Sequence, residues 1–167
     1  DNSTEVAEAS TTDTVTVVLD AEPDSTVEFS ITTDDDGEAT ATEILTFDGS
    51  NWNTPQTVII TGVDDNIIDG TILSTLTIAI NDENSDDNFD TLNDHQISIS
   101  TQDDDVAGFT IVETEGSTIV NEAGETDTFA IVLNAQPTSN VQILVSQPTD
   151  PQSGQIAVQS VSDEATI

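Results

Sequence analysis

Aliphatic and β-branched residues alternate with polar residues along much of this chain. Between residues 13 and 19, for example, Val15, Val17 and Leu19 recur at every second position. A period of two indicates a strand with one face buried and one face in solvent. Gly, Asn, Asp and Pro separate the apolar runs, as turn residues separate the strands of a sandwich, and no stretch has a helical period. The pattern predicts an all-β chain folded as antiparallel β-sandwiches. The expected strands are 13–19, 26–33, 39–47, 57–63, 71–80, 96–101, 109–113, 128–133, 141–146 and 155–159.

The chain also resembles itself at a spacing of 114 residues. Twelve of the 22 positions from Val6 to Val27 carry the same residue as the position 114 residues later. Such self-similarity is typical of tandem repeats. It predicts one repeat over residues 1–106 and the N-terminal half of the next over 107–167. The segment 108–114 has no counterpart in the first repeat, because its counterpart would precede residue 1. Two explanations remain open: the chain is a fragment, or neighbouring chains supply the missing strand.

The charged side chains of this chain are almost all acidic. It has 34 Asp and Glu residues, no Lys or Arg and one His, for a formal net charge of -34. A nucleic-acid partner is excluded because no cationic side chain is present to displace phosphate counterions, and anionic membrane surfaces are disfavoured for the same reason. No apolar run approaches the roughly 18 residues of a membrane span, and no Cys is present for disulfides or redox chemistry. The repulsion among the carboxylates opposes a compact state, so the fold needs counterions.

The order of the expected strands gathers many of the acids at one end of the first sandwich. Antiparallel strands reverse direction at each turn, so alternate connections share an end. Oxygen ligands without His or Cys favour calcium over zinc or copper, and solvated turn residues are the alternative. A further acidic run, 81–87, falls at the opposite end, where a second ion and a solvated loop remain equal alternatives. The acids expected at the first end are Glu8, Asp34, Asp35, Asp36, Glu38, Asp64, Asp65, Asp69, Asp103, Asp104 and Asp105.

Four motifs among these residues resemble the Calx-β domain, which occurs in sodium–calcium exchangers, one integrin β subunit and many large bacterial surface proteins. They are Val6-Ala7-Glu8, Asp36-Gly37, the run from Asp64 to Asp69, and Asp103-Asp104-Asp105. The resemblance implies tandem immunoglobulin-like sandwiches of the Calx-β type with clustered Ca²⁺ at one end. The family commonly has Glu where this chain has Asp69. The implied ligands are Glu8, Asp36, Asp64, Asp65, the backbone carbonyl of Ile67, Asp69, Asp103, Asp104 and Asp105.

These observations predict a structural protein and not an enzyme, because the chain lacks Cys, Lys, Arg and Tyr and has a single His, His95, at the start of a strand. We expect a calcium-binding repeat of a secreted or cell-surface protein, in which Ca²⁺ stiffens the joint between domains of an adhesive stalk. Its partners would be neighbouring repeats or adjacent copies of the chain. The alternative is a subunit of an extracellular filament or sheath that assembles by strand complementation between chains.

Overall fold

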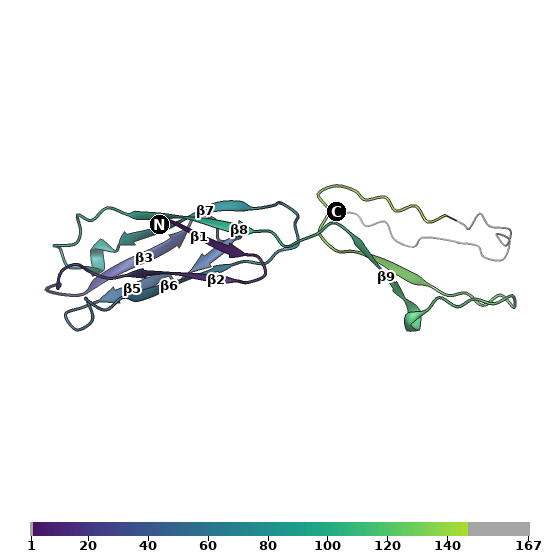
Figure 1. The fold of residues 1–167 in the computed structure, drawn as a ribbon, viewed down its shortest axis with the longest axis horizontal. Coiled ribbons are helices and arrows are strands. Elements are labelled where there is room, and N and C mark those ends of the chain that lie inside the picture. Colours follow the sequence, from purple (N-terminus) through teal and green to yellow (C-terminus); the bar gives the residue numbers. More distant parts are fainter. Residues whose placement is uncertain (1, 147–167) are drawn as a thin grey trace. The chain divides into compact units, whose positions relative to one another are not determined.

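The computed structural model describes residues 2–146, which fall into two compact units (Figure 1). The first unit contains Asp1–Asp65 and Asp69–Asp104. Within the described residues, the second contains Asn66–Ile68 and residues 105–146.

The first unit has two β-sheets. One sheet has five strands in the order β1-β8-β7-β3-β5, and the other has three in the order β2-β6-β4. Every pairing is antiparallel except that of β1 with β8, which is parallel. The strands are β1 (Ser3–Ala7), β2 (Thr12–Val17), β3 (Val27–Thr33), β4 (Ala39–Ala41), β5 (Ile44–Phe47), β6 (Gln56–Gly62), β7 (Ile72–Ile80) and β8 (His95–Gln102).

The core of the first unit lies between these sheets and follows the alternation of the sequence. In β3, Val27, Phe29 and Ile31 are buried, and the intervening residues are partly exposed. Phe47 is fully buried and meets the ring of Phe29 edge to face at 5.9 Å between centroids. Burial of such side chains is the main favourable contribution to folding, and an edge-to-face aromatic pair adds to it.

The connection between β7 and β8 is anchored by one buried acid. It contains the short 3₁₀ helix η1 (Asp82–Asn84), and Asp86 follows at 5% exposure. The Asp86 carboxylate accepts backbone N–H groups from Asp24 (2.6 Å), Ser25 (3.0 Å) and Asn88 (2.9 Å). These bonds lower the pKa of Asp86, with the Asn88 backbone as the largest cause. Asp86 therefore ties this connection to the one between β2 and β3.

The second unit has a two-stranded antiparallel sheet of β9 (Phe109–Glu113) and β10 (Phe129–Leu133). The 3₁₀ helix η2 (Thr114–Gly116) follows β9 directly. Ile67 forms an isolated parallel bridge with Gln136 within this unit. All five residues of β9 are exposed.

The all-β class predicted from the sequence is confirmed, with differences in detail. The expected strand 39–47 is two strands, because the chain leaves the sheet of β4 at Ala41 and joins the other sheet at Ile44. β1 was not expected. The strand expected at 141–146 is wrong: Val141 and Leu144 are 51% and 92% exposed, and no described strand pairs with them. The strand expected at 155–159 lies outside the described residues, and the tandem arrangement stays a prediction.

Candidate metal centre

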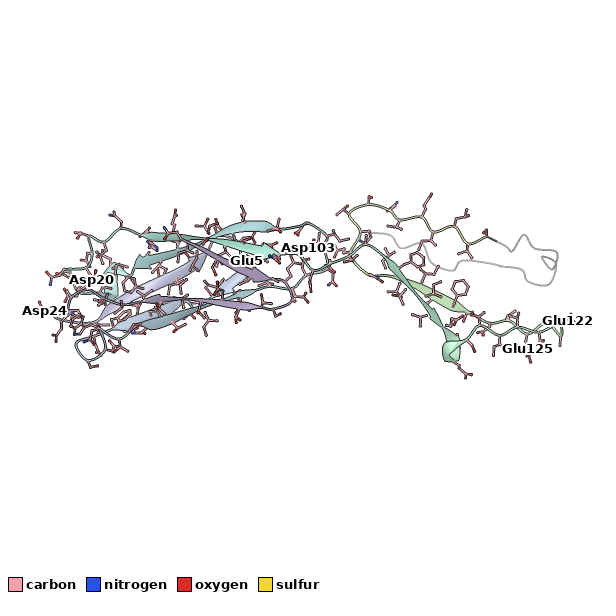
Figure 2. The ribbon with its side chains drawn as sticks, in the orientation of Figure 1. Glu5, Asp20, Asp24, Asp103, Glu122 and Glu125 are labelled. Atoms are coloured by element: carbon pink, nitrogen blue, oxygen red, sulfur yellow. The ribbon has the colours of Figure 1, made fainter. Side chains whose placement is uncertain are left out.

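Four parts of the first unit bring carboxylates to one end of its sheets. β1 and β8 run parallel with Ala7 opposite Gln102, so Glu8 and Asp103 follow at the same end. β4 begins beside the last residue of β6, with Ala39 opposite Gly62, which places Glu38 at that end as well. The connection from β6 to β7 supplies Asp64, Asp65 and Asp69. Figure 2 shows Asp103 at this end and Asp20 and Asp24 at the opposite end of the unit.

A close backbone contact fixes the position of Glu8. A Cβ atom at Gly62 would lie 2.1 Å from the carbonyl oxygen of Ala7, so only glycine lets β1 end this close to β6. The Gly62 N–H donates to the Thr11 carbonyl at 3.0 Å, and the Glu8 N–H donates to the Gln102 carbonyl at 3.0 Å. Glu8 is therefore held between β6 and β8, and its side chain is only 1% exposed.

Glu8, Glu38 and Asp69 form the centre of the site, which we call the Glu8 cluster. One carboxylate oxygen from each lies within 4.8 Å of the other two. Glu38 is 9% exposed, and Asp69 is exposed. The Oε2 atoms of Glu8 and Glu38 are buried and have no hydrogen-bond partner among the described residues. Buried polar atoms are normally satisfied by hydrogen bonds, so two unsatisfied carboxylate oxygens within a group of three acids need an explanation.

Burial and like charges both oppose ionisation in this cluster. The pKa of Glu8 is raised from 4.5 to about 7, first by desolvation and then by the charges of Asp103, Asp65, Asp69 and Glu38. The pKa of Glu38 is raised as well, first by desolvation and then by Asp69 and other acids. A proton or a cation is therefore needed to stabilise these side chains in the folded state.

Asp103 holds the loop that carries Asp69. Its Oδ2 accepts the backbone N–H groups of Asp69 at 3.1 Å and Gly70 at 2.8 Å. Gly70 has a φ of +79°, a left-handed conformation that glycine adopts without steric cost. Asp103 thus positions Asp69 through the backbone and also adds its charge to the environment of Glu8.

The residues expected as ligands divide into three groups. Glu8 and Asp69 lie in the cluster. The charges of Asp65 and Asp103 contribute to the raised pKa of Glu8. Asp36, Asp64 and Asp104 are exposed and belong to no compact group of acids among the described residues. Ile67 and Asp105 belong to the second unit.

Two neighbouring acids on the connection that carries Asp36 have local roles. Asp34 accepts the Thr75 N–H at 2.6 Å, and Asp35 accepts the Gly37 N–H at 3.2 Å.

Glu38 is the cluster residue that the family motif did not select. The resemblance pointed to Asp36-Gly37, two residues earlier, although Glu38 was among the acids expected at this end. Glu38 lies directly before β4, whose first residue, Ala39, is fully buried. The backbone carbonyl of Glu38 accepts the Val63 N–H at 2.9 Å, which fixes the backbone at this position. A residue in such a setting cannot turn freely toward solvent.

The donor set fits a hard divalent cation. Three carboxylates supply only oxygen, the ligand type that Ca²⁺ takes in groups of six to eight with carbonyls and waters. His95 begins β8 and Asp103 follows the end of that strand, so the imidazole lies a strand length from the cluster. A bound cation would interact with the unpaired Oε2 atoms of Glu8 and Glu38. The Asp69 carboxylate and water molecules would complete the coordination shell of the ion.

Comparisons with known proteins give a fold likeness only. No protein-family model and no curated protein matches the chain. Among solved structures, CBD12 from CALX1.2 is 13% identical, with a TM-score of 0.42 over 80% of this chain and 67% of that one. The E. coli chaperone DraB is 11% identical, with a TM-score of 0.43 over 83% and 85%. A Bacteroides ovatus GH5 xyloglucanase is 14% identical, with a TM-score of 0.41; the match covers 60% of this chain but only 17% of the xyloglucanase.

These likenesses are too distant to carry an argument about function. Among the described residues, no helix has the length and apolar character needed to cross a membrane.

Proposed function

We propose that this chain is a calcium-binding structural segment of an extracellular surface protein, without enzymatic activity. The observation that carries the proposal is the buried, unpartnered carboxylate pair of Glu8 and Glu38 beside Asp69. The Calx-β-like motifs support calcium as the ion. Binding would replace the proton that Glu8 otherwise holds near neutral pH, and it would stabilise the folded state because the unfolded chain lacks the assembled site.

The proposed role in a stalk follows from the connectivity. Only residues 103–108 separate β8 of the first unit from β9 of the second, and they begin at Asp103. An ion held at Glu8 would restrain the start of this connection and stiffen the chain there. The partners would then be neighbouring repeats of the same protein.

The test is a calcium titration of chelator-treated full-length chain at constant ionic strength, followed by thermal unfolding. We expect the melting temperature to rise with calcium and to respond much less to magnesium, which dehydrates reluctantly. Glu38→Gln should remove most of this rise. Glu43→Gln, which changes an exposed glutamate, should keep it. A melting temperature that follows total salt alone would refute the metal site.

A second candidate function is a filament or sheath subunit that assembles by strand complementation. Among the described residues, the end strands of the two sheets of the first unit are β1, β5, β2 and β4. An edge strand offers unpaired backbone groups to another chain.

A further inference from the structure

The parallel pair of β1 and β8 decides how the first unit responds to tension. All other strand pairs described in this unit are antiparallel. The chain enters β1 at Ser3, which lies opposite Ser98 of β8. It leaves β8 at Gln102, which lies opposite Ala7 at the other end of β1. The entry and the exit are therefore separated by the whole ladder of five residue pairs, or roughly 16 Å.

Tension applied just before β1 and just after β8 acts along this ladder. Because the two points of attachment lie at its opposite ends, the strands must slide past each other, and the hydrogen bonds between them are loaded together. If both attachments were at the same end, the ladder would open one bond at a time. This difference depends only on the directions of the two strands, so it holds whatever residues precede Ser3.

The backbone bonds of β1 show which of its residues would carry the load. The Glu8 N–H donates to the Gln102 carbonyl at 3.0 Å, and the Asn2 carbonyl accepts an N–H of β8 at 3.0 Å. Bonding residues alternate along a parallel strand, so the even-numbered residues of β1 bond to β8. The odd-numbered residues turn their N–H groups away from β8, as the Ala7 N–H does when it donates to the Thr11 hydroxyl at 2.6 Å.

Side chains also hold β1 in place on both of its faces. On the inner face, Val6 and Thr4 are buried, and the Thr4 hydroxyl donates to the Asp13 carboxylate at 2.5 Å. On the outer face, the Gln102 side chain donates to the Glu5 carboxylate. β8 is in turn paired with β7 along most of its length. These contacts oppose detachment of β1, so the ladder with β8 is anchored in the body of the first unit.

We propose that the first unit bears tensile force and that the ladder between β1 and β8 sets the force at which the unit yields. The proposal rests on the structural role proposed above and adds a mechanical function to it. It does not depend on calcium, because the ladder consists of protein hydrogen bonds alone. Glu8 follows β1 directly, so an ion in the Glu8 cluster would reinforce one end of the ladder without creating it.

The test is single-molecule force spectroscopy of the full-length chain in chelator. The natural chain has no Cys, so handles can be attached at two introduced cysteines. The pair Asn2→Cys and Asp104→Cys lies on either side of the ladder and loads it in shear. The control pair, Asn2→Cys and Gln96→Cys, keeps the first attachment and moves the second to the start of β8, so that tension peels β1 away from one end. All three positions are exposed.

We expect the first rupture to need several times more force with the shearing pair than with the peeling pair. Equal forces would overturn the proposal. With the shearing pair, Thr4→Pro should lower the rupture force, because it deletes an N–H that bonds to β8. Glu5→Pro, at a position whose N–H points away from β8, should lower it much less, and equal losses in the two variants would also overturn the proposal.

The comparison of the two attachment pairs decides the question even if Thr4→Pro prevents folding, because it leaves the residues of β1 from Ser3 to Ala7 unchanged. Calcium is absent from these measurements, so equal rupture forces would leave the metal site to its own test. A missing calcium response in thermal unfolding would likewise leave the ladder to this one.

Discussion

Glu8→Gln is the substitution with the clearest energetic consequence. The side chain is 1% exposed, and its Oε2 has no hydrogen-bond partner within the part of the chain that the structure describes. Without a cation, the folded protein must either bury this charge or bind a proton. Glutamine keeps the size of the side chain and removes the charge, so the substitution isolates the electrostatic cost of Glu8.

The pKa of Glu8 gives the magnitude and the sign. It is about 7 in the folded state against 4.5 for an unperturbed glutamate, so between these pH values the folded state binds the proton more tightly than the unfolded state. In chelator, the free energy of unfolding of the natural chain therefore falls as pH rises from 4.5 through 7. A shift of this size corresponds to about 3 kcal/mol. The Glu8→Gln variant lacks this pH-dependent loss of stability. At pH 8 it should therefore be more stable than the natural chain by up to about 3 kcal/mol, or roughly 10–20 °C in melting temperature. At pH 4.5 the two proteins should be similar.

The assay is urea unfolding followed by fluorescence, since the single tryptophan, Trp52, packs against the core of the first unit and reports on that unit alone. Glu83→Gln is the matched control, because Glu83 is an exposed glutamate at the opposite end. Saturating calcium should stabilise the natural chain and the control but not Glu8→Gln. The reasoning would be refuted if Glu8→Gln and the natural chain showed the same pH dependence in chelator.

Three further substitutions and one control test the fold of the first unit. Gly62→Ala should destabilise the first unit by about 1–3 kcal/mol and weaken calcium binding, measured by calorimetry, because its Cβ would displace the Ala7 backbone. Asp86→Ala should cost about 3 kcal/mol in urea unfolding, because it leaves backbone N–H groups without their acceptor. Phe47→Ala should cost about 3–5 kcal/mol by the same measurement, while Ile44→Ala, at a 53% exposed position of the same strand, should cost much less.

Strands with clear alternation were predictable from the sequence, because burial of one face imposes a period of two. β3, β6, β7 and β9 lie within one residue of their expected bounds. β1 was missed because only Thr4 and Val6 face inward, too few residues to establish a period. The strand expected at 141–146 is not formed although its apolar residues alternate: no strand of the described residues pairs with it, and alternation alone does not make a strand.

The end of the sandwich that carries the acids was predictable, but the members of the cluster were not. Alternating connections placed Glu8, Asp65, Asp69 and Asp103 together, because antiparallel order fixes which loops share an end. The choice of Glu38 over Asp36 depends on side-chain burial beside β4, which no spacing rule encodes. The depth of Glu8 likewise depends on contact between β1 and Gly62, which are distant in sequence.

Two kinds of acid in this chain should respond differently to salt and to calcium. Most of the charge sits on exposed side chains, whose mutual repulsion monovalent salt screens over a Debye length of about 8 Å at physiological ionic strength. Desolvation is the largest cause of the raised pKa of Glu8, and salt does not restore lost hydration. Sodium chloride should therefore raise the melting temperature of the natural chain and of Glu8→Gln equally, in chelator at pH 8. Calcium added after this salt response is complete should raise the melting temperature of the natural chain further, but not that of Glu8→Gln. An equal calcium response in both proteins would mean that the ion acts by screening the exposed acids and that Glu8 does not bind it.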